Sequence, residues 1–314
     1  MPESGPRTVA DPAAPRSADP RPGLLDRIPA PILVISAIAS VQAGSAIARN
    51  LFDQMSTSGV LFLRLSIAAV VMLAVVRPRV RSWSRSTWFA VLLMGVCVAA
   101  LNQVFYLAIA HIPLGIAVTI EFLGPLLLSV VQTRRPTDLV WAALALAGVA
   151  ILGLGSGTGS GAISALGVGL ALLSGLLWAM YILASARLGA ALPGMDGLAV
   201  SITVAAIIIL PLGGRDALVA LHEPSLLMTA ALVALLSSVI CYSFEMTALR
   251  RLPTRVFGIL MSIEPAAAAI AGLVILGQAL APSQLLALVL VTLASAGVTL
   301  TATRRASPPS AQLT

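Results

Sequence analysis

Long apolar runs alternate with short polar segments along most of the chain, and each run has the length of a membrane-spanning helix. A helix needs about 20 mostly apolar residues to cross a bilayer. Ten such runs are predicted, at 30–48, 57–76, 88–110, 113–131, 138–154, 162–188, 195–212, 225–249, 254–276 and 282–301. Only His111 and Ile112 separate the third run from Pro113. Because proline interrupts a helix and the joined run exceeds one span, we count two helices there. The pattern predicts an all-α polytopic membrane protein.

The arginines support this number of spans and orient them. All 19 basic residues of the chain are arginine. With ten spans and a cytoplasmic N-terminus, sixteen of them fall in cytoplasmic segments, Arg49 and Arg215 fall outside, and Arg64 lies within the second span. Basic residues collect on the cytoplasmic side, and one missed span would reverse every later loop. The distribution therefore predicts ten helices with both termini cytoplasmic.

Composition excludes a soluble domain. The 314 residues are 59% hydrophobic and 10% charged, with a mean hydropathy of +1.01, whereas soluble domains carry about 25% charged residues. The net charge of +7 does not indicate a nucleic-acid partner, because the arginines lie between apolar runs rather than along one stripe. Cys97 and Cys241 stand alone in apolar runs, which predicts buried small side chains without metal or redox chemistry.

The two halves of the chain are related by an internal repeat. At an offset of 140 residues, three identities align: Ala108 with Ala248, Pro113 with Pro253, and Pro125 with Pro265. Each copy contains a helix end, a short turn with proline, and a helix with a glutamate just before a second proline. The copies lie five helices apart, and since five is odd the second crosses the membrane in the opposite sense. We therefore predict two inverted five-helix repeats, an arrangement typical of transporters.

This repeat sets the predicted domain organisation. Residues 1–29 are rich in proline, alanine, arginine and aspartate, and we expect a disordered cytoplasmic tail there. The first repeat is predicted at 30–154, a glycine- and serine-rich linker at 155–161, the second repeat at 162–302, and a second cytoplasmic tail at 303–314. Three glycines of the sixth span indicate close helix packing: Gly167, Gly169 and Gly175.

Polar residues within the apolar spans indicate a binding site. An ionisable side chain near the bilayer centre costs at least about 2.5–3.5 kcal/mol, so it requires a partner or a water-filled cavity. At about 1.5 Å per residue, polar groups from several helices reach neighbouring depths, and Arg64 and Glu121 fall in one layer where they can pair. The predicted substrate-binding residues are Gln42, Arg64, Asn102, Tyr106, Glu121, Trp178 and Glu264.

Structural roles remain open for these residues. Arg64 can extend to the outer headgroups, and Gln42 and Asn102 can hydrogen-bond between helices. Glu121 and Glu264 precede Pro125 and Pro265, which are expected to kink their helices, so each can serve packing around the kink.

Two further features are open as well. Trp178 shares a helix face with Tyr181, which also fits an aromatic belt. Glu245 lies near Arg250 and Arg255, and we expect a solvated ion pair at the inner interface there.

Several kinds of chemistry have no sequence support. No GxxxxGK[ST] motif is present, so no ATP site is encoded. His111 and His222 are predicted in loops, so neither a buried Ser–His pair nor a histidine metal site is expected. We expect no catalytic residues, no metal and no cofactor, and therefore no enzyme.

The segment P-L-G-I-A-V-x-I-E-F-L-G-P at 113–125, the S-x-E-P of Ser262–Pro265 and the arginine of the second span resemble the EamA branch of the drug/metabolite transporter superfamily. The chain is most similar to its bacterial threonine/homoserine exporter group, and the resemblance covers 30–301. It implies export of amino acids or related small metabolites, driven by a proton gradient or by exchange. It also places Glu121 and Glu264 at positions typical of the family.

The sequence therefore predicts a secondary transporter of the bacterial cytoplasmic membrane that exports threonine- or homoserine-like metabolites by alternating access. Arg64 is expected to neutralise Glu121 or to bind the substrate carboxylate, and Glu121 or Glu264 to bind the ammonium group. Expected partners are the small-molecule substrate, protons and membrane lipid, with the chain as a monomer or homodimer. Two alternatives remain: an exporter of cationic or amphipathic drugs, and a non-transporting scaffold or intramembrane lipid enzyme.

Overall fold

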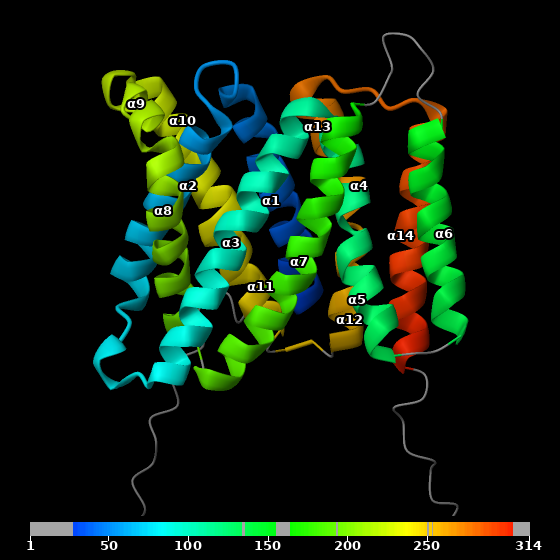
Figure 1. Ribbon diagram of the computed structural model, residues 1–314, viewed down its shortest axis with the longest axis horizontal. Helices are drawn as coiled ribbons and strands as arrows, with labels where there is room; N and C mark the ends of the chain where they lie inside the picture. The colour runs from blue at the N-terminus through cyan, green and yellow to red at the C-terminus, as the bar shows by residue number, and fades with distance from the viewer. Residues whose placement is uncertain are drawn as a thin grey trace, which may run out of the picture.

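The structure is a bundle of long antiparallel helices (Figure 1). It is a computed structural model that describes residues 28–133, 136–154, 164–192, 194–249, 251–252 and 254–303. Most of the two predicted tails, the predicted linker at 155–161, and Arg134, Arg135, Arg250 and Pro253 lie outside the described residues. Within that part of the chain, nine helices are long and apolar enough to cross a membrane, and a shorter apolar helix covers Leu139–Leu152. The predicted all-helical, polytopic architecture is confirmed.

The first half of the chain forms five spans, one of which is broken. Its helices are α1 (Ala30–Leu51), α2 (Thr57–Val76), α3 (Arg85–His111), α4 (Leu114–Glu121), α5 (Leu123–Thr133) and α6 (Pro136–Leu154), with the short 3₁₀-helix η2 (Val80–Ser82) before α3. Serine side chains start two of them, because Ser56 Oγ accepts from the Gly59 amide at 3.1 Å and Ser84 Oγ from the Thr87 amide at 3.2 Å.

The second half forms five spans with two interruptions. Its helices are α7 (Ala165–Ala191), α8 (Asp196–Ala217), α9 (Val219–His222), α10 (Pro224–Ala234), the π-helix η3 (Leu235–Ile240), α11 (Cys241–Leu249), α12 (Thr254–Met261), α13 (Glu264–Leu276) and α14 (Pro282–Thr303). The breaks between α4 and α5 and between α12 and α13 stand a few residues before Pro125 and Pro265. These breaks coincide with the positions where kinks are predicted.

Several predicted helix ends were wrong by three to five residues. For example, α1 continues to Leu51, α3 begins at Arg85 and α8 continues to Ala217, where the predicted limits were 48, 88 and 212. The predictions followed side-chain hydropathy, but the backbone continues its own hydrogen bonds through polar residues at the ends of the apolar layer.

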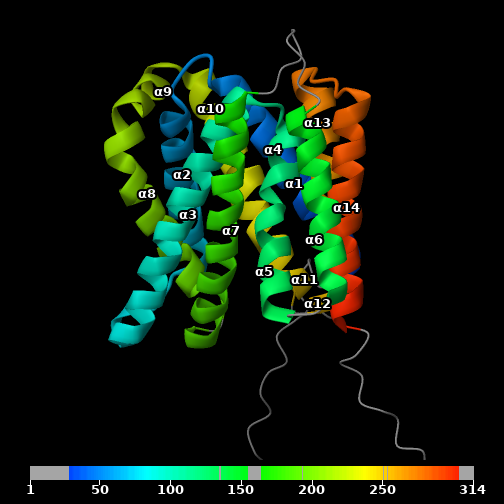
Figure 2. The same cartoon turned by 45° about the vertical axis from the view of Figure 1, so that its right-hand side comes forward.

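Equivalent helices of the two halves make equivalent contacts, each with the first helix of the other half. In the first half α3 packs along α7, and in the second η3 and α11 pack along α1. Likewise α4 and α5 pack on α7, whereas α12 and α13 pack on α1. Spans that correspond in the two halves also pair directly: α2 with α8, and α6 with α14 at the edge of the bundle (Figures 1 and 2).

The two ends of the bundle differ in the described loops. The start of α1, the α2–α3 and α7–α8 loops and the end of α14 lie at one end, here named the inner end, and the α1–α2 loop and α9 lie at the opposite, outer end (Figure 1). Arg77, Arg79, Arg81 and Arg187 belong to the inner end and Arg49 and Arg215 to the outer end. The charge pattern predicts that the inner end faces the cytoplasm.

Glycines bring some helix backbones into direct contact. Gly124 and Gly175 meet between α5 and α7, and a Cβ on Gly175 would stand 2.6 Å from the Glu121 carbonyl oxygen. Gly167 is also tightly packed, against Ile112. Gly169 is exposed and a Cβ there would meet nothing within 4 Å, so the packing role predicted for that glycine was wrong.

Two alanine substitutions on the same helix test this contact. We expect Gly175→Ala to destabilise the fold by about 1–3 kcal/mol, because its Cβ overpacks a backbone carbonyl that cannot rotate away. Gly169→Ala is the matched control and is expected to be neutral or slightly stabilising, because alanine favours helix and the site is open. Thermal unfolding in detergent measures both, and equal midpoints would contradict the packing argument.

Candidate functional site

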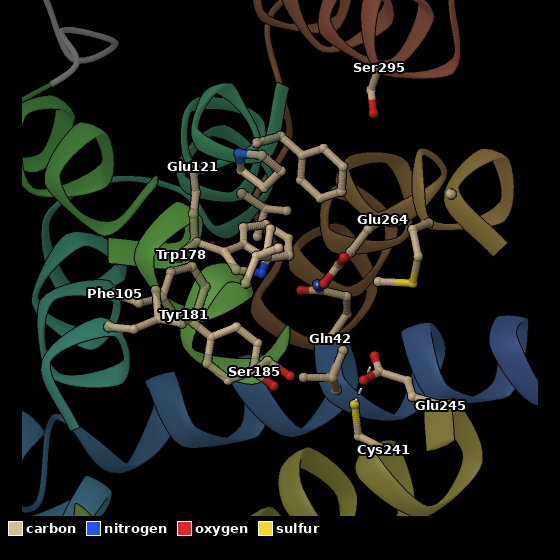
Figure 3. Close-up of a pocket in the computed structure, with 18 of the residues that line it drawn as sticks. Gln42, Phe105, Glu121, Trp178, Tyr181, Ser185, Cys241, Glu245, Glu264 and Ser295 are labelled. Atoms are coloured by element: carbon tan, nitrogen blue, oxygen red, sulfur yellow. Dashed lines mark hydrogen bonds between the residues drawn. The ribbon is translucent and has the colours of Figure 1, made fainter. Parts of the chain in front are cut away.

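A cavity of about 500 Å³ lies inside the bundle, lined by residues of eight of its spans. Six of the seven predicted site residues line it: Gln42, Arg64, Asn102, Glu121, Trp178 and Glu264. The seventh, Tyr106, is fully buried beside Arg64. Figure 3 shows residues from both halves of the chain around this space. The cavity size falls within the range of small-molecule sites.

Arg64 is the cation of the cavity lining, and its described partners are all neutral. Its guanidinium donates to Ser238 Oγ at 3.2 Å, to the Tyr106 hydroxyl at 3.1 Å and to the Ser237 carbonyl at 3.3 Å. The side chain is 4% exposed, so it does not extend to the headgroups. The proposed pairing with Glu121 is absent from the ion pairs of the described residues. Three of five N–H groups are used, which leaves two for a ligand.

The π-helix η3 explains why these acceptors are available. An α-helix bonds each carbonyl to the amide four residues later, whereas the wider turn of η3 changes this register at Ser237 and Ser238. Their carbonyl and hydroxyl groups then serve Arg64. Single π-turns in α-helices occur frequently at functional sites.

Glu121 is held by α7 rather than by Arg64. Its carboxylate accepts a hydrogen bond from Ser174 Oγ, and its carbonyl oxygen lies against Gly175. Pro125 lacks the amide that would bond this carbonyl in a continuous helix. Glu121 therefore lies at the break between α4 and α5, with its carboxylate at the cavity wall.

Gln42 and Glu264 form a hydrogen-bonded pair from α1 and the start of α13 (Figure 3). Gln42 Nε2 donates to Glu264 Oε1 at 3.0 Å. The other oxygens, Gln42 Oε1 and Glu264 Oε2, are buried and have no partner. Because a buried polar atom without a partner costs free energy, this pair offers two acceptors to a ligand donor. The N-terminus of α13 also favours the negative charge of Glu264.

A third carboxylate, that of Glu245, lies in the cavity wall. Glu245 lines the cavity and accepts from Cys241 Sγ at 3.5 Å, so it is not confined to the inner interface where sequence placed it. The expected partners Arg250 and the Arg255 side chain lie outside what the structure describes. Cys241 is buried, as expected, but it also lines the cavity.

Known transporters resemble this chain in sequence. A family model described as the EamA-like transporter family matches residues 165–300. The threonine/homoserine exporter RhtA of Escherichia coli (strain K12) is 41% identical over 283 residues, which are 89% of this chain and 95% of the relative. RhtA of Salmonella typhimurium (strain LT2) is 41% identical over 286 residues, 90% of this chain and 96% of the relative. The chain belongs to the EamA family.

A solved crystal structure shares the fold of this EamA-family protein. It aligns with a TM-score of 0.59 over 88% of this chain and 99% of the other, at 18% identity. Family membership and the membrane-length helices make the chain a multi-pass protein of the bacterial inner membrane. Its matched relatives are transporters rather than enzymes. Among the described residues, no group of three or more His, Cys, Asp or Glu side chains could hold a metal ion.

Several lining residues of this EamA-family cavity were missed by sequence reasoning. They include Ser185, Ser237, Tyr242 and Ser295, together with Tyr181, for which an aromatic belt was the alternative. Trp178 packs edge-on against Phe122, with ring centroids 4.9 Å apart, and so joins the two halves at the cavity wall. The spacing of Ser237, Cys241 and Glu245, four residues apart each time, was the available signal.

Proposed function

We propose that this EamA-family protein is a secondary transporter that exports small zwitterionic amino acids, such as threonine or homoserine, from the cytoplasm. Family membership supports transport, and the names of the relatives at 41% identity support this substrate class. The substrate would bind in the cavity between the two halves.

The distribution of unused hydrogen-bonding groups carries the proposal. Arg64 has two spare N–H donors and a charge balanced by no described carboxylate. Gln42 and Glu264 supply two spare acceptors in the same cavity. An α-amino acid presents a carboxylate and an ammonium on one carbon, so Arg64 would bind the carboxylate and the Gln42–Glu264 pair the ammonium. Asn102, Tyr106, Glu121 and Trp178 would position these groups or complete the wall.

The position of the cavity supports loading from the inner end. Its lining includes Ser129, Ser185 and Phe257, which stand near the inner ends of α5, α7 and α12. At the outer end α4 packs on α13, where a Cβ on Gly115 would stand 2.8 Å from Ala269 Cα, and the Leu114 amide donates to Gln278 at 3.0 Å. The described state would therefore be open inward and closed outward, as an exporter needs before it binds substrate.

Inverted repeats would give the opposite state. The exchanged packing partners support a two-fold relation between the halves. At the offset of 140 residues, eight pairs of lining positions also correspond, among them Leu101 with Cys241, Asn102 with Tyr242, and Phe105 with Glu245. If the halves exchange conformations, the inner halves close and the outer halves open around the same cavity. The kinks at Phe122 and Ser262–Ile263 would be the bends. A proton gradient or exchange against another solute would drive the cycle.

A second candidate, export of amphipathic cations, has one observation in its favour. The cavity combines carboxylates with the rings of Phe105, Phe122 and Trp178, which suits a flat cationic ligand. Such a ligand has no anionic group for Arg64 to bind, and the buried positive charge of Arg64 would repel it. The zwitterion therefore fits the lining better.

Counterflow in proteoliposomes tests the proposal. Vesicles loaded with unlabelled homoserine or threonine are diluted into the labelled compound, and uptake above protein-free vesicles is expected for both amino acids. Excess internal cationic drug should drive little or no uptake. The proposal fails if folded protein gives no counterflow while the Escherichia coli relative, reconstituted alongside, is active. Drug-driven uptake that persists in Arg64→Met would favour the second candidate.

A further inference from the structure

Acidic residues outnumber basic ones among the described residues that line the cavity. Three carboxylates line it, those of Glu121, Glu245 and Glu264, against the single guanidinium of Arg64 among the described lining residues. A zwitterionic amino acid brings one charge of each sign. A ligand with an additional positive charge would match the lining more closely.

The three carboxylates differ in how well they are satisfied. Glu121 accepts from the Ser174 hydroxyl and Glu264 from the Gln42 amide. Glu245 has a thiol as its described donor, Cys241 Sγ at 3.5 Å, and a thiol is a weak donor. Of these three, Glu245 has the weakest described donor, so its carboxylate can accept a stronger hydrogen bond from a ligand.

Resting on the function proposed above, we propose that Glu245 forms a second ammonium site, so that the cavity also accepts α-amino acids whose side chain ends in an ammonium group. Arg64 and the Gln42–Glu264 pair would bind the α-carboxylate and α-ammonium as before. Glu245 would bind the terminal ammonium.

The spacing along the eighth span fits such a ligand. Glu245 follows Cys241 by one α-helical turn, about 6 Å, and Cys241 follows Ser237 by one turn that includes the π-helix η3. All three residues line the cavity. Helical side chains lean towards the N-terminus, so the Glu245 carboxylate lies near the Cys241 turn, as their contact shows (Figure 3). The Ser237 carbonyl that binds Arg64 belongs to the preceding turn, about 6 Å away along the helix axis between equivalent atoms.

Ornithine has the required reach. An extended chain advances about 1.2 Å per bond, and five bonds separate the carboxyl carbon of ornithine from its terminal nitrogen, which gives about 6 Å. Norvaline has the same carbon skeleton without the terminal amine. The two amino acids therefore form a matched pair that differs in the proposed contact.

Trans-stimulated uptake measures the difference. Vesicles containing the full chain are loaded with equal concentrations of ornithine, norvaline or homoserine, and the uptake of labelled homoserine is recorded. In wild type we expect ornithine to drive at least about tenfold more uptake than norvaline, because a charge-assisted hydrogen bond is involved. Glu245→Gln should remove this advantage, lowering ornithine-driven uptake about tenfold more than homoserine-driven uptake. Glu245→Asp, which keeps the charge, should retain part of it.

Controls separate this inference from the function on which it rests. Glu223→Gln alters an exposed carboxylate beyond the cavity lining and should keep the ornithine advantage. Equal uptake with ornithine and norvaline in wild type would overturn the second site while homoserine counterflow continues. So would a Glu245→Gln protein with the advantage intact, or one that loses ornithine- and homoserine-driven uptake in equal measure. If homoserine itself gives no counterflow, the proposed function fails first.

Discussion

Arg64→Met is expected to weaken homoserine counterflow more than any other substitution, with a loss of apparent affinity of at least about thirtyfold. The guanidinium is buried, its described partners are neutral, and its spare donors lie in the cavity wall. A substrate carboxylate brought into that cavity without it would lose its counter-charge and two hydrogen bonds. Arg64→Lys should retain only part of the wild-type affinity for homoserine, because an ammonium cannot reproduce the planar, forked hydrogen-bond geometry of a guanidinium.

A substrate analogue separates binding from folding in this experiment. Threonine amide lacks the carboxylate charge, so it should compete poorly with labelled threonine in wild type. If Arg64 binds the carboxylate, Arg64→Met should lower the apparent affinity for threonine strongly and that for threonine amide little. The two affinities should then become similar. Arg187→Met, an exposed arginine of α7, is the control with the same substitution and should behave as wild type. Equal weakening of threonine and its amide would indicate that Arg64 only supports the fold around η3.

The sequence was most informative about the helices and the depth of polar groups. Ten spans were predicted from run length and from the arginine distribution, because the bilayer constrains both, and the described residues contain nine helices of membrane length and one shorter apolar helix. Gln42, Arg64, Glu121 and Glu264 were expected in one zone because the helix rise converts residue number into depth. Depth does not determine which side of a helix faces which neighbour. For this reason the Arg64–Glu121 pair that depth allows is absent from the ion pairs of the described residues, and Glu121 is turned to Ser174 on α7.

Other features had no local signal. The π-helix η3 changes the register of one turn, and nothing in Leu235–Ile240 distinguishes it from an ordinary apolar helix. Glu245 was assigned by the charges nearest in sequence, whereas the cavity is built by helices distant in sequence. Gly169 and Gly175 look alike in the chain, yet one is exposed and the other contacts a backbone. Tertiary packing determines each of these features.

Glu264→Gln is expected to have the second-largest effect, a loss of at least about tenfold in apparent affinity for homoserine. The substitution keeps the size of the side chain and its hydrogen-bonding partner Gln42, so the pair can persist while the negative charge is lost. The ammonium would then meet a neutral amide in place of a carboxylate. Glu264→Asp keeps the charge but shortens the side chain, so its apparent affinity for homoserine should lie between those of wild type and Glu264→Gln.

A second analogue identifies the ammonium as the group concerned. In 2,4-dihydroxybutyrate a hydroxyl replaces the ammonium of homoserine while the carboxylate and the chain remain. Wild type should prefer homoserine strongly, and Glu264→Gln should lose most of this preference, because the carboxylate that distinguishes the two is gone. The same analogue in Arg64→Met should show the preference retained, since that residue would bind the opposite end of the substrate. If the Glu264→Gln protein folds, transports and keeps the full preference for homoserine, the ammonium binds elsewhere in the cavity. Glu121 would then be the next residue to replace.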